Sequence, residues 1–187
     1  NDISLPNNWV PIGKRIDENE ASIKKGANLY AFSGTIDGNN HLLTVPEGEK
    51  PLLGYVQGAE VKNLNILGKR IEGYGLVDNF AGVGLVGDAI IIDNVTLKEG
   101  TQTLKSGLIG GEITENPFAA ASAGFQATIR NCTVEKGVAI GYSGEMSKIG
   151  SFAGALQGTI ENCTSYATVK GKNMVGGIIG TRDNAMG

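Results

Sequence analysis

The chain has few of the residues that build metal centres and histidine-based active sites. Its 187 residues include one histidine, His41, and two cysteines, Cys132 and Cys163. A zinc site with two histidine ligands is therefore excluded, and no Cys-x-x-Cys pair is present. No glycine-framed serine elbow accompanies His41, as a hydrolase triad would require. We expect no metal ion and assign no catalytic residue.

Long apolar runs and basic stretches are also missing. No apolar run approaches about 18 residues, the length needed to span a bilayer, so we expect no membrane insertion. Charges of both signs are mixed and the formal net charge is −3, which argues against nucleic-acid binding. Residues 82–87 (GVGLVG) match the dinucleotide motif G-x-G-x-x-G, but we expect a strand, not a helix, to follow. No cofactor is therefore predicted.

Proline and aromatic residues are scarce, whereas glycine is abundant. The chain has five prolines and 29 glycines, about twice the usual share of glycine. Many glycines among abundant aliphatic residues indicate short buried strands joined by tight corners, since disordered chains lack apolar residues. The length suits one domain with a sizeable core.

A four-residue pattern recurs along the chain: an aliphatic residue, a charged residue, asparagine and a second apolar residue. Its copies are Val61-Lys62-Asn63-Leu64, Ile92-Asp93-Asn94-Val95, Ile129-Arg130-Asn131-Cys132 and Ile160-Glu161-Asn162-Cys163. The asparagines are 31, 37 and 31 residues apart, a period typical of a solenoid. Short segments rich in Ile, Val and Thr and bounded by glycine favour strands. We predict an all-β fold, a parallel β-helix over residues 28–187.

Side-chain parity changes at each asparagine. Residues on one side of a straight strand are two apart, yet Val61 and Ile66 are both apolar and five apart. Asparagine tolerates the left-handed conformation that a bend requires, so we expect the chain to bend there. The predicted bend residues are Asn63, Asn94, Asn131 and Asn162. We expect them to face inward with stacked amides, so that the Asn-x-Thr sequons at Asn94, Asn131 and Asn162 are not glycosylated.

The same parity predicts which neighbours of the asparagines face inward or outward. The predicted inward set is Val61, Leu64, Ile66, Ile92, Val95, Leu97, Ile129, Cys132 and Val134. The outward residues before the asparagines, Lys62, Asp93, Arg130 and Glu161, alternate in sign and predict an exterior charge ladder. Its rungs would lie about 4.8 Å apart. A second outward polar row is predicted at Asn65, Thr96, Thr133 and Thr164.

The two cysteines occupy equivalent places in adjacent units. They should face inward, one above the other. In-register stacking keeps their Cβ atoms about 5 Å apart, beyond the disulfide range of about 3.5–4.5 Å. We predict two stacked, buried free thiols at Cys132 and Cys163, with a disulfide as the alternative.

Glycine-bracketed apolar blocks accompany the repeat. They are Leu52–Gly54, Gly84–Gly87, Gly107–Gly110, Phe152–Gly154 and Gly177–Gly180. Residues 1–27 differ from the repeat and are predicted to cap its first end, with a short helix at residues 17–25 (DENEASIKK). The final block begins a unit that residues 181–187 do not complete. We expect more polypeptide beyond Gly187, or another chain covering this end.

Two stretches break the period and are predicted loops, where binding residues tend to lie. They are Glu112–Ser122, within the poorly repeating residues 111–123, and Ala139–Gly150.

Several of these segments resemble a known family. Gly107–Gly110 (GLIG) and Gly177–Gly180 (GIIG), paired with Thr159–Cys163 (TIENC), resemble the GLUG repeat of bacterial surface proteins. Trp9–Gly13 followed by Phe32–Asn39 is similar to the segment that often precedes those repeats. The resemblance covers most of residues 9–180 and implies a right-handed parallel β-helix in a secreted or cell-surface protein. The family includes non-catalytic regions of IgA-cleaving metallopeptidases, whose His-Glu-x-x-His motif is absent here.

The function expected from this reasoning is a non-catalytic extracellular module of a bacterial surface protein. It would act as an adhesin-like binding surface or a spacer, with a host or cell-wall glycan or protein as its partner. The alternative is a polysaccharide-acting β-helix enzyme, a lyase or hydrolase, since long grooves suit polymers. Stacking can bring acids together, but nothing in the sequence marks a raised pKa set against a nucleophile. The acids considered are Asp78, Asp88, Asp93, Glu112 and Glu115.

Overall fold

All regular structure in the described part of the chain is β-strand. The computed structural model describes residues 1–13, 31–80, 88–110, 126–156 and 158–182. The helix predicted at 17–25, the GVGLVG segment and the loop at 112–122 lie outside these residues. Within the described segments there is no helix long and apolar enough to cross a bilayer. The all-β class predicted from the sequence is confirmed.

The largest sheet, called the main sheet below, has nine strands in the order β1-β3-β5-β7-β10-β14, with β2, β9 and β13 paired beside this path. Every pairing in it is parallel, because the chain returns to the same sheet after each unit. Its strands are β1 (Ile3–Ser4), β2 (Thr35–Asp37), β3 (Leu42–Val45), β5 (Ala59–Gly68), β7 (Asp88–Leu97), β9 (Gln126–Arg130), β10 (Thr133–Val134), β13 (Gly158–Glu161) and β14 (Thr164–Ser165).

Between successive strands of the main sheet, the chain forms strands that belong to two further parallel sets. One is a three-stranded sheet of β8 (Gln102–Thr103), β11 (Ala139–Ile140) and β15 (Thr168–Val169). The other consists of the pairs β4 (Leu53–Val56) with β6 (Val77–Phe80) and β12 (Ala153–Leu156) with β16 (Ile179–Arg182). Single bridges at Ile109 link these two pairs into one row, called the side sheet below.

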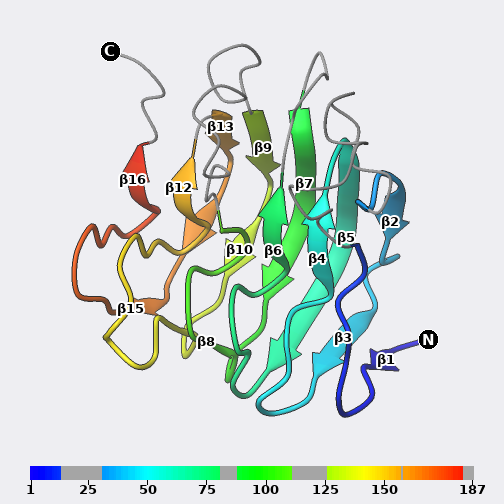
Figure 1. The fold of residues 1–187 in the computed structure, drawn as a ribbon, viewed down its shortest axis with the longest axis horizontal. Coiled ribbons are helices and arrows are strands. Elements are labelled where there is room, and N and C mark those ends of the chain that lie inside the picture. Colours follow the sequence, from blue (N-terminus) through cyan, green and yellow to red (C-terminus); the bar gives the residue numbers. More distant parts are fainter. Residues whose placement is uncertain (14–30, 81–87, 111–125, 157, 183–187) are drawn as a thin grey trace, which may run out of the picture.

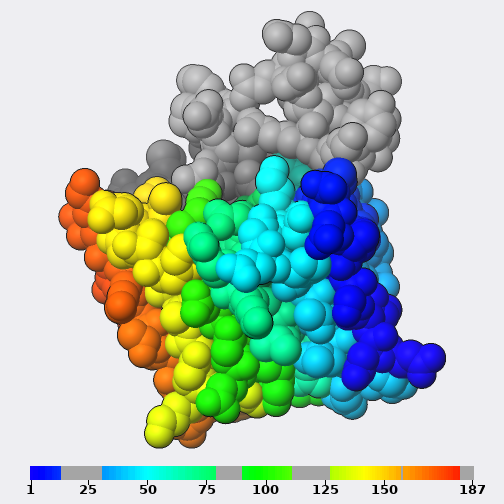
Figure 2. Space-filling view, turned by 90° about the horizontal axis from the view of Figure 1, so that it is seen from below, coloured from blue at the N-terminus to red at the C-terminus, as the bar shows by residue number. Residues whose placement is uncertain are grey.

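The units follow one another in chain order across the molecule. In Figure 1 the colours run from blue at β1 to red at β16, and the strands of each unit lie beside those of the next. Figure 2 shows the same order as parallel bands of colour on the surface. Each described unit therefore packs mainly on the units immediately before and after it.

The core fills the space between the sheets. All nine residues of the predicted inward set are buried. Leu64 keeps a small exposed fraction, and the other eight, seven aliphatic residues and Cys132, have no exposed surface. The outward prediction also holds for the polar row, since the register aligns Asn65 with Thr96, Thr96 with Thr133, and Thr133 with Thr164. Parity reasoning across the asparagines thus identified both faces of the main sheet correctly.

One glycine-bracketed segment of the side sheet was not predicted. The side sheet aligns Leu53 with Val77 and Val77 with Ile109, so Gly75-Leu76-Val77 stands in register with the predicted blocks at Leu52–Gly54 and Gly107–Gly110. The predicted block Gly84–Gly87 lies outside the described residues. The predicted loop at Ala139–Gly150 also begins as strand β11 before the chain turns. Residues 1–13 do lie at the first edge, where β1 pairs with β3 and Ile12 bridges to Leu53.

Candidate functional site

Five charged residues stand side by side on the outer face of the main sheet and form what we call the charged row. The register aligns them in the order Asp37, Lys62, Asp93, Arg130 and Glu161. Their signs alternate along the whole row. Asp37 was not predicted from the sequence because Gly38 separates it from Asn39, which interrupts the four-residue pattern.

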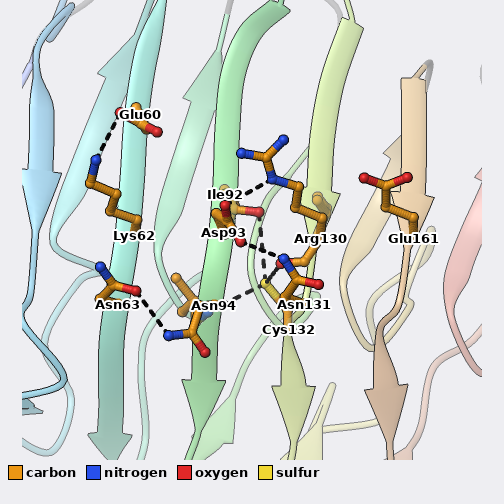
Figure 3. Close-up of polar contacts among 12 residues, drawn as sticks. Glu60, Lys62, Asn63, Ile92, Asp93, Asn94, Arg130, Asn131, Cys132 and Glu161 are labelled. Atoms are coloured by element: carbon orange, nitrogen blue, oxygen red, sulfur yellow. Dashed lines mark hydrogen bonds and ion pairs between the residues drawn. The ribbon is translucent and has the colours of Figure 1, made fainter.

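Contacts within the charged row are uneven. The Arg130 Nε donates to Asp93 Oδ2 at 2.8 Å, and the Asn131 amide donates to Asp93 Oδ1 at 2.8 Å (Figure 3). The bond from Asn131 and the pairing with Arg130 lower the pKa of Asp93, and the same ion pair raises the pKa of Arg130. The Lys62 ammonium lies 3.6 Å from Glu60 instead. The predicted charge ladder is therefore present in the alignment of the strands, but one direct ion pair, Arg130 with Asp93, forms along it.

All four predicted bend residues have the left-handed conformation. Their φ angles are 52° at Asn63, 53° at Asn94, 56° at Asn131 and 50° at Asn162. The Asn94 amide donates to Asn63 Oδ1 at 2.9 Å, whereas the Asn63 amide donates to Asp37 and the Asn131 amide to Asp93. One of these amides, that of Asn94, thus donates to another amide, whereas the amides of Asn63 and Asn131 donate to carboxylates.

The inward orientation predicted for these asparagines is wrong. Asn94, Asn131 and Asn162 are exposed and Asn63 is half-buried. The reason is geometric: a left-handed residue turns both of its apolar neighbours into the core, which leaves its own side chain on the outside of the corner. The burial argument against glycosylation of the Asn-x-Thr sequons therefore does not hold.

Replacing Asn94 by alanine tests the bend. We expect Asn94→Ala to lower the free energy of unfolding by about 1–2 kcal/mol, because an L-residue with a Cβ and no local hydrogen bond is strained in the left-handed region. Asn94→Gly is the matched control and should cost less, since glycine adopts this conformation readily. Urea unfolding of the three proteins measures the difference, and an alanine variant as stable as the glycine variant would contradict the assignment.

The two cysteines are free and stacked, but only one is buried. Cys132 has no exposed surface, whereas Cys163 is half-buried. The prediction of two buried thiols is thus wrong for Cys163, because the strand that follows it, β14, pairs only with β10 in the described part of the chain. No described strand covers its other side.

The thiols accept hydrogen bonds from the corner of the preceding unit. The Val95 N–H donates to Cys132 Sγ at 3.5 Å, and the Cys132 N–H donates to Cys163 Sγ at 3.4 Å. Each donor follows a left-handed asparagine, so its N–H points into the corner and not along the sheet. The cysteines were predicted to stack, and their role as hydrogen-bond acceptors was not predicted.

The two thiols should differ sharply in reactivity. Burial raises the pKa of the Cys132 thiol to about 12, which leaves about a thousandfold less thiolate than an ordinary cysteine has. Burial raises the pKa of Cys163 as well, but this residue is partly exposed. In native protein at pH 8 we expect a disulfide reagent to label Cys163 first and Cys132 only on unfolding. Cys163→Ser should abolish the faster phase, and Cys132→Ser should retain it.

Acids proposed for glycoside chemistry are not brought together where the structure describes them. Asp93 belongs to β7 of the main sheet, and Asp78 belongs to β6 of the side sheet. Glu112 and Glu115 lie outside the described residues, as does the side chain of Asp88. No cluster of three or more His, Cys, Asp or Glu side chains suited to a metal ion occurs in the described segments.

Asp78 differs from the other acids in its environment. Its register position in the side sheet is held by glycine in the neighbouring units, at Gly54, Gly110, Gly154 and Gly180. Burial raises the pKa of Asp78, and the positive charges of Lys105 and Lys50 partly offset this effect. Among the described carboxyl groups with a resolved shift, Asp78 alone has a raised pKa.

The chain was compared with protein-family models, with curated proteins and with solved structures. None of the three comparisons finds a match.

Proposed function

We propose that the chain is a right-handed parallel β-helix of the GLUG-repeat type, serving as a non-catalytic extracellular module of a bacterial surface protein. Three observations support this architecture: the parallel pairings, the passage of each unit through three sets of strands, and the return to the main sheet one strand further on. The right hand is proposed because crossovers between parallel strands are right-handed in about 98% of cases. The role is adhesin-like binding or spacing.

The observation that carries the functional proposal is the use of polar groups on the outer main sheet. Asp93 is held ionised by Arg130 and Asn131, as the lowered pKa of its carboxyl group reflects. A general acid in glycoside cleavage needs a raised pKa and a second carboxylate set opposite it. On this face Asp93 instead bonds to Arg130 and Asn131, within a row of charges in regular register on parallel strands.

Such a surface suits a hydroxyl-rich or polar partner. The threonine row, formed by Thr96, Thr133 and Thr164, places hydroxyl groups on neighbouring parallel strands about 4.8 Å apart. Next to it, Lys98 and Glu135 form an ion pair. Regularly spaced donors and acceptors can meet the repeating hydroxyls of a glycan or the backbone of an extended protein. We propose a host or cell-wall glycan or protein as the partner.

A binding and turnover screen tests this function. The full chain is immobilised and exposed to cell-wall polysaccharides, pectins, alginates, host mucin glycans and matrix proteins, with retention and released products both measured. Thr133→Val, which removes one hydroxyl at nearly constant shape, should weaken binding by about fivefold. The matched control is Thr168→Val on β15 of the three-stranded sheet, which should not change it. Equal effects would leave the spacer role, and product release would contradict a non-catalytic module.

A polysaccharide-acting enzyme is the second candidate, and Asp78 is the observation that favours it. A half-buried acid with a raised pKa is the type of group that donates a proton to a leaving oxygen. Turnover that disappears in Asp78→Asn, while binding persists, would support this candidate over the first.

Asp78→Asn also has an expected effect on stability. A carboxyl group whose pKa is raised on folding holds its proton more tightly in the folded state. Stability therefore falls as pH rises through and above the ordinary carboxyl pKa of about 4. Asp78→Asn removes this loss, so the variant should gain stability relative to the parent between pH 4 and pH 7. Thermal unfolding across this range measures the gain, and a gain confined to lower pH would contradict it.

A further inference from the structure

The strands of the last unit form an open edge, called the terminal edge below. In the described part of the chain, β13, β14, β15 and β16 each pair with a strand on one side only, at the orange-to-red end of Figure 1. Large exposed hydrophobic side chains gather in this unit: Tyr166 (66% exposed), Met174 (56%), Val175 (43%) and Ile178 (42%). An edge of unpaired backbone groups next to apolar side chains is a template for another strand.

The charged row predicts the charge that a docked strand should carry. The row ends at Glu161, whose carboxylate makes no ion pair with any described residue. Figure 3 draws no contact from it to the other residues shown. Arg130 does not turn toward it, because its guanidinium is bonded to Asp93 on the opposite side. The signs alternate through five strands, so we expect a cation at the position that follows Glu161.

The hydrogen bonds at the asparagine corners set a second condition on the docked strand. At each of the two preceding corners, the N–H that follows the asparagine donates to a thiol in the next unit, first to Cys132 and then to Cys163. The equivalent donor at the terminal edge is the N–H of Cys163 itself. A docked strand with cysteine after its asparagine would supply the matching sulfur acceptor.

A second copy stacked head to tail does not meet the first requirement. The charged row begins with Asp37 on β2, so such a copy would align Asp37 with Glu161. Like charges directly opposite each other in a sheet are destabilising. The occupant must begin with the opposite sign.

We propose that the terminal edge docks a parallel strand carrying the sequence aliphatic–Lys/Arg–Asn–Cys. Its cation would face Glu161, its aliphatic residue would cover Ile160, and its asparagine amide would align with Asn162. Its cysteine would stack on Cys163 and accept the N–H there. The segment Ile129-Arg130-Asn131-Cys132 of this chain has this chemistry, which makes it a probe of known sequence. The inference does not depend on the surface function proposed above.

Peptide binding to the full chain tests the proposal under reducing conditions. The probe is a fluorescent peptide of residues 126–140 (QATIRNCTVEKGVAI), and the matched control is the same peptide with Arg130→Glu. We expect the arginine peptide to bind about fivefold more tightly, and to raise the melting temperature of the protein increasingly as the peptide concentration exceeds its Kd. The protein variant Glu161→Lys should reverse this preference. Glu47→Lys, an exposed substitution in the first units, should leave it unchanged.

Four results would overturn the proposal. The first is equal binding of the two peptides, and the second is no binding of either up to millimolar concentration. The third is concentration-dependent self-association that Glu161→Lys abolishes, seen by sedimentation, since it would identify a second copy as the occupant. A preference that survives Glu161→Lys unchanged would likewise show that this residue does not select the strand.

Discussion

The substitution Gly107→Ala will lower the free energy of unfolding by about 3 kcal/mol or more. A Cβ atom at this position would lie 1.8 Å from the carbonyl oxygen of Ser151 in the next unit. Neither side can move away easily, because the Gly107 N–H is itself bonded to the Gly150 carbonyl oxygen at 3.1 Å. The clash is therefore backbone against backbone, and relieving it means separating two units of the side sheet.

The last unit supplies a matched control for Gly107. Gly177 holds the same place relative to the side sheet, but a Cβ there meets no atom within 4 Å. Gly177→Ala should change stability by less than about 0.5 kcal/mol. Gly107→Ala should lower the melting temperature by about 6–12 °C, measured by calorimetry or circular dichroism. Equal shifts in the two variants would show that close approach between units does not explain this glycine.

The substitution Ile92→Ala should cost about 2–5 kcal/mol, because it empties the centre of the core. Ile92 has no exposed surface and lies on β7, which has strands paired on both sides. Removing its methyl and methylene groups loses transfer free energy and leaves a cavity that neighbours on two strands cannot fill.

The neighbouring residue distinguishes burial from strand propensity. Ile91 is on the same strand but faces outward and is half-buried. Ile91→Ala removes the same atoms and should cost about 1 kcal/mol or less. Chemical denaturation of both variants checks the difference. If Ile91→Ala were the more costly of the two, the parity of β7 would be wrong.

The inward and outward faces of the main sheet were predictable because they depend on local rules. Alternation along a strand and a single left-handed residue at each corner suffice to place Val61, Leu64 and Ile66 in the core. The same rules predicted the alternating charges, since residues at equivalent places in successive units share a register position.

Contacts in which a side chain could bond to either of two neighbours were not predictable in this way. Arg130 lies between two acids in the charged row, and only the structure shows that it bonds to Asp93. The side-sheet segment at Gly75 was missed because a second glycine-bracketed segment, Gly84–Gly87, lies close to it in the sequence. The spacing of 32 residues between Gly75 and Gly107 matches the period and could have identified it. Exposure of Cys163 depends on what covers the terminal edge, which no local pattern states.

The parallel pairing of successive units also bears on how the chain folds. Contacts between successive units join residues separated by 25 positions in Thr35 with Glu60 and by 44 in Ser106 with Gly150, while the side-chain contact of Tyr142 with Glu72 spans 70. Strand pairing among the described residues joins each unit to its neighbours, so each unit can form on the one before it. Amide hydrogen exchange should be slowest in β5 and β7, where both neighbours are present, and faster toward β14. A chain built in this way can open from one end while its centre stays folded.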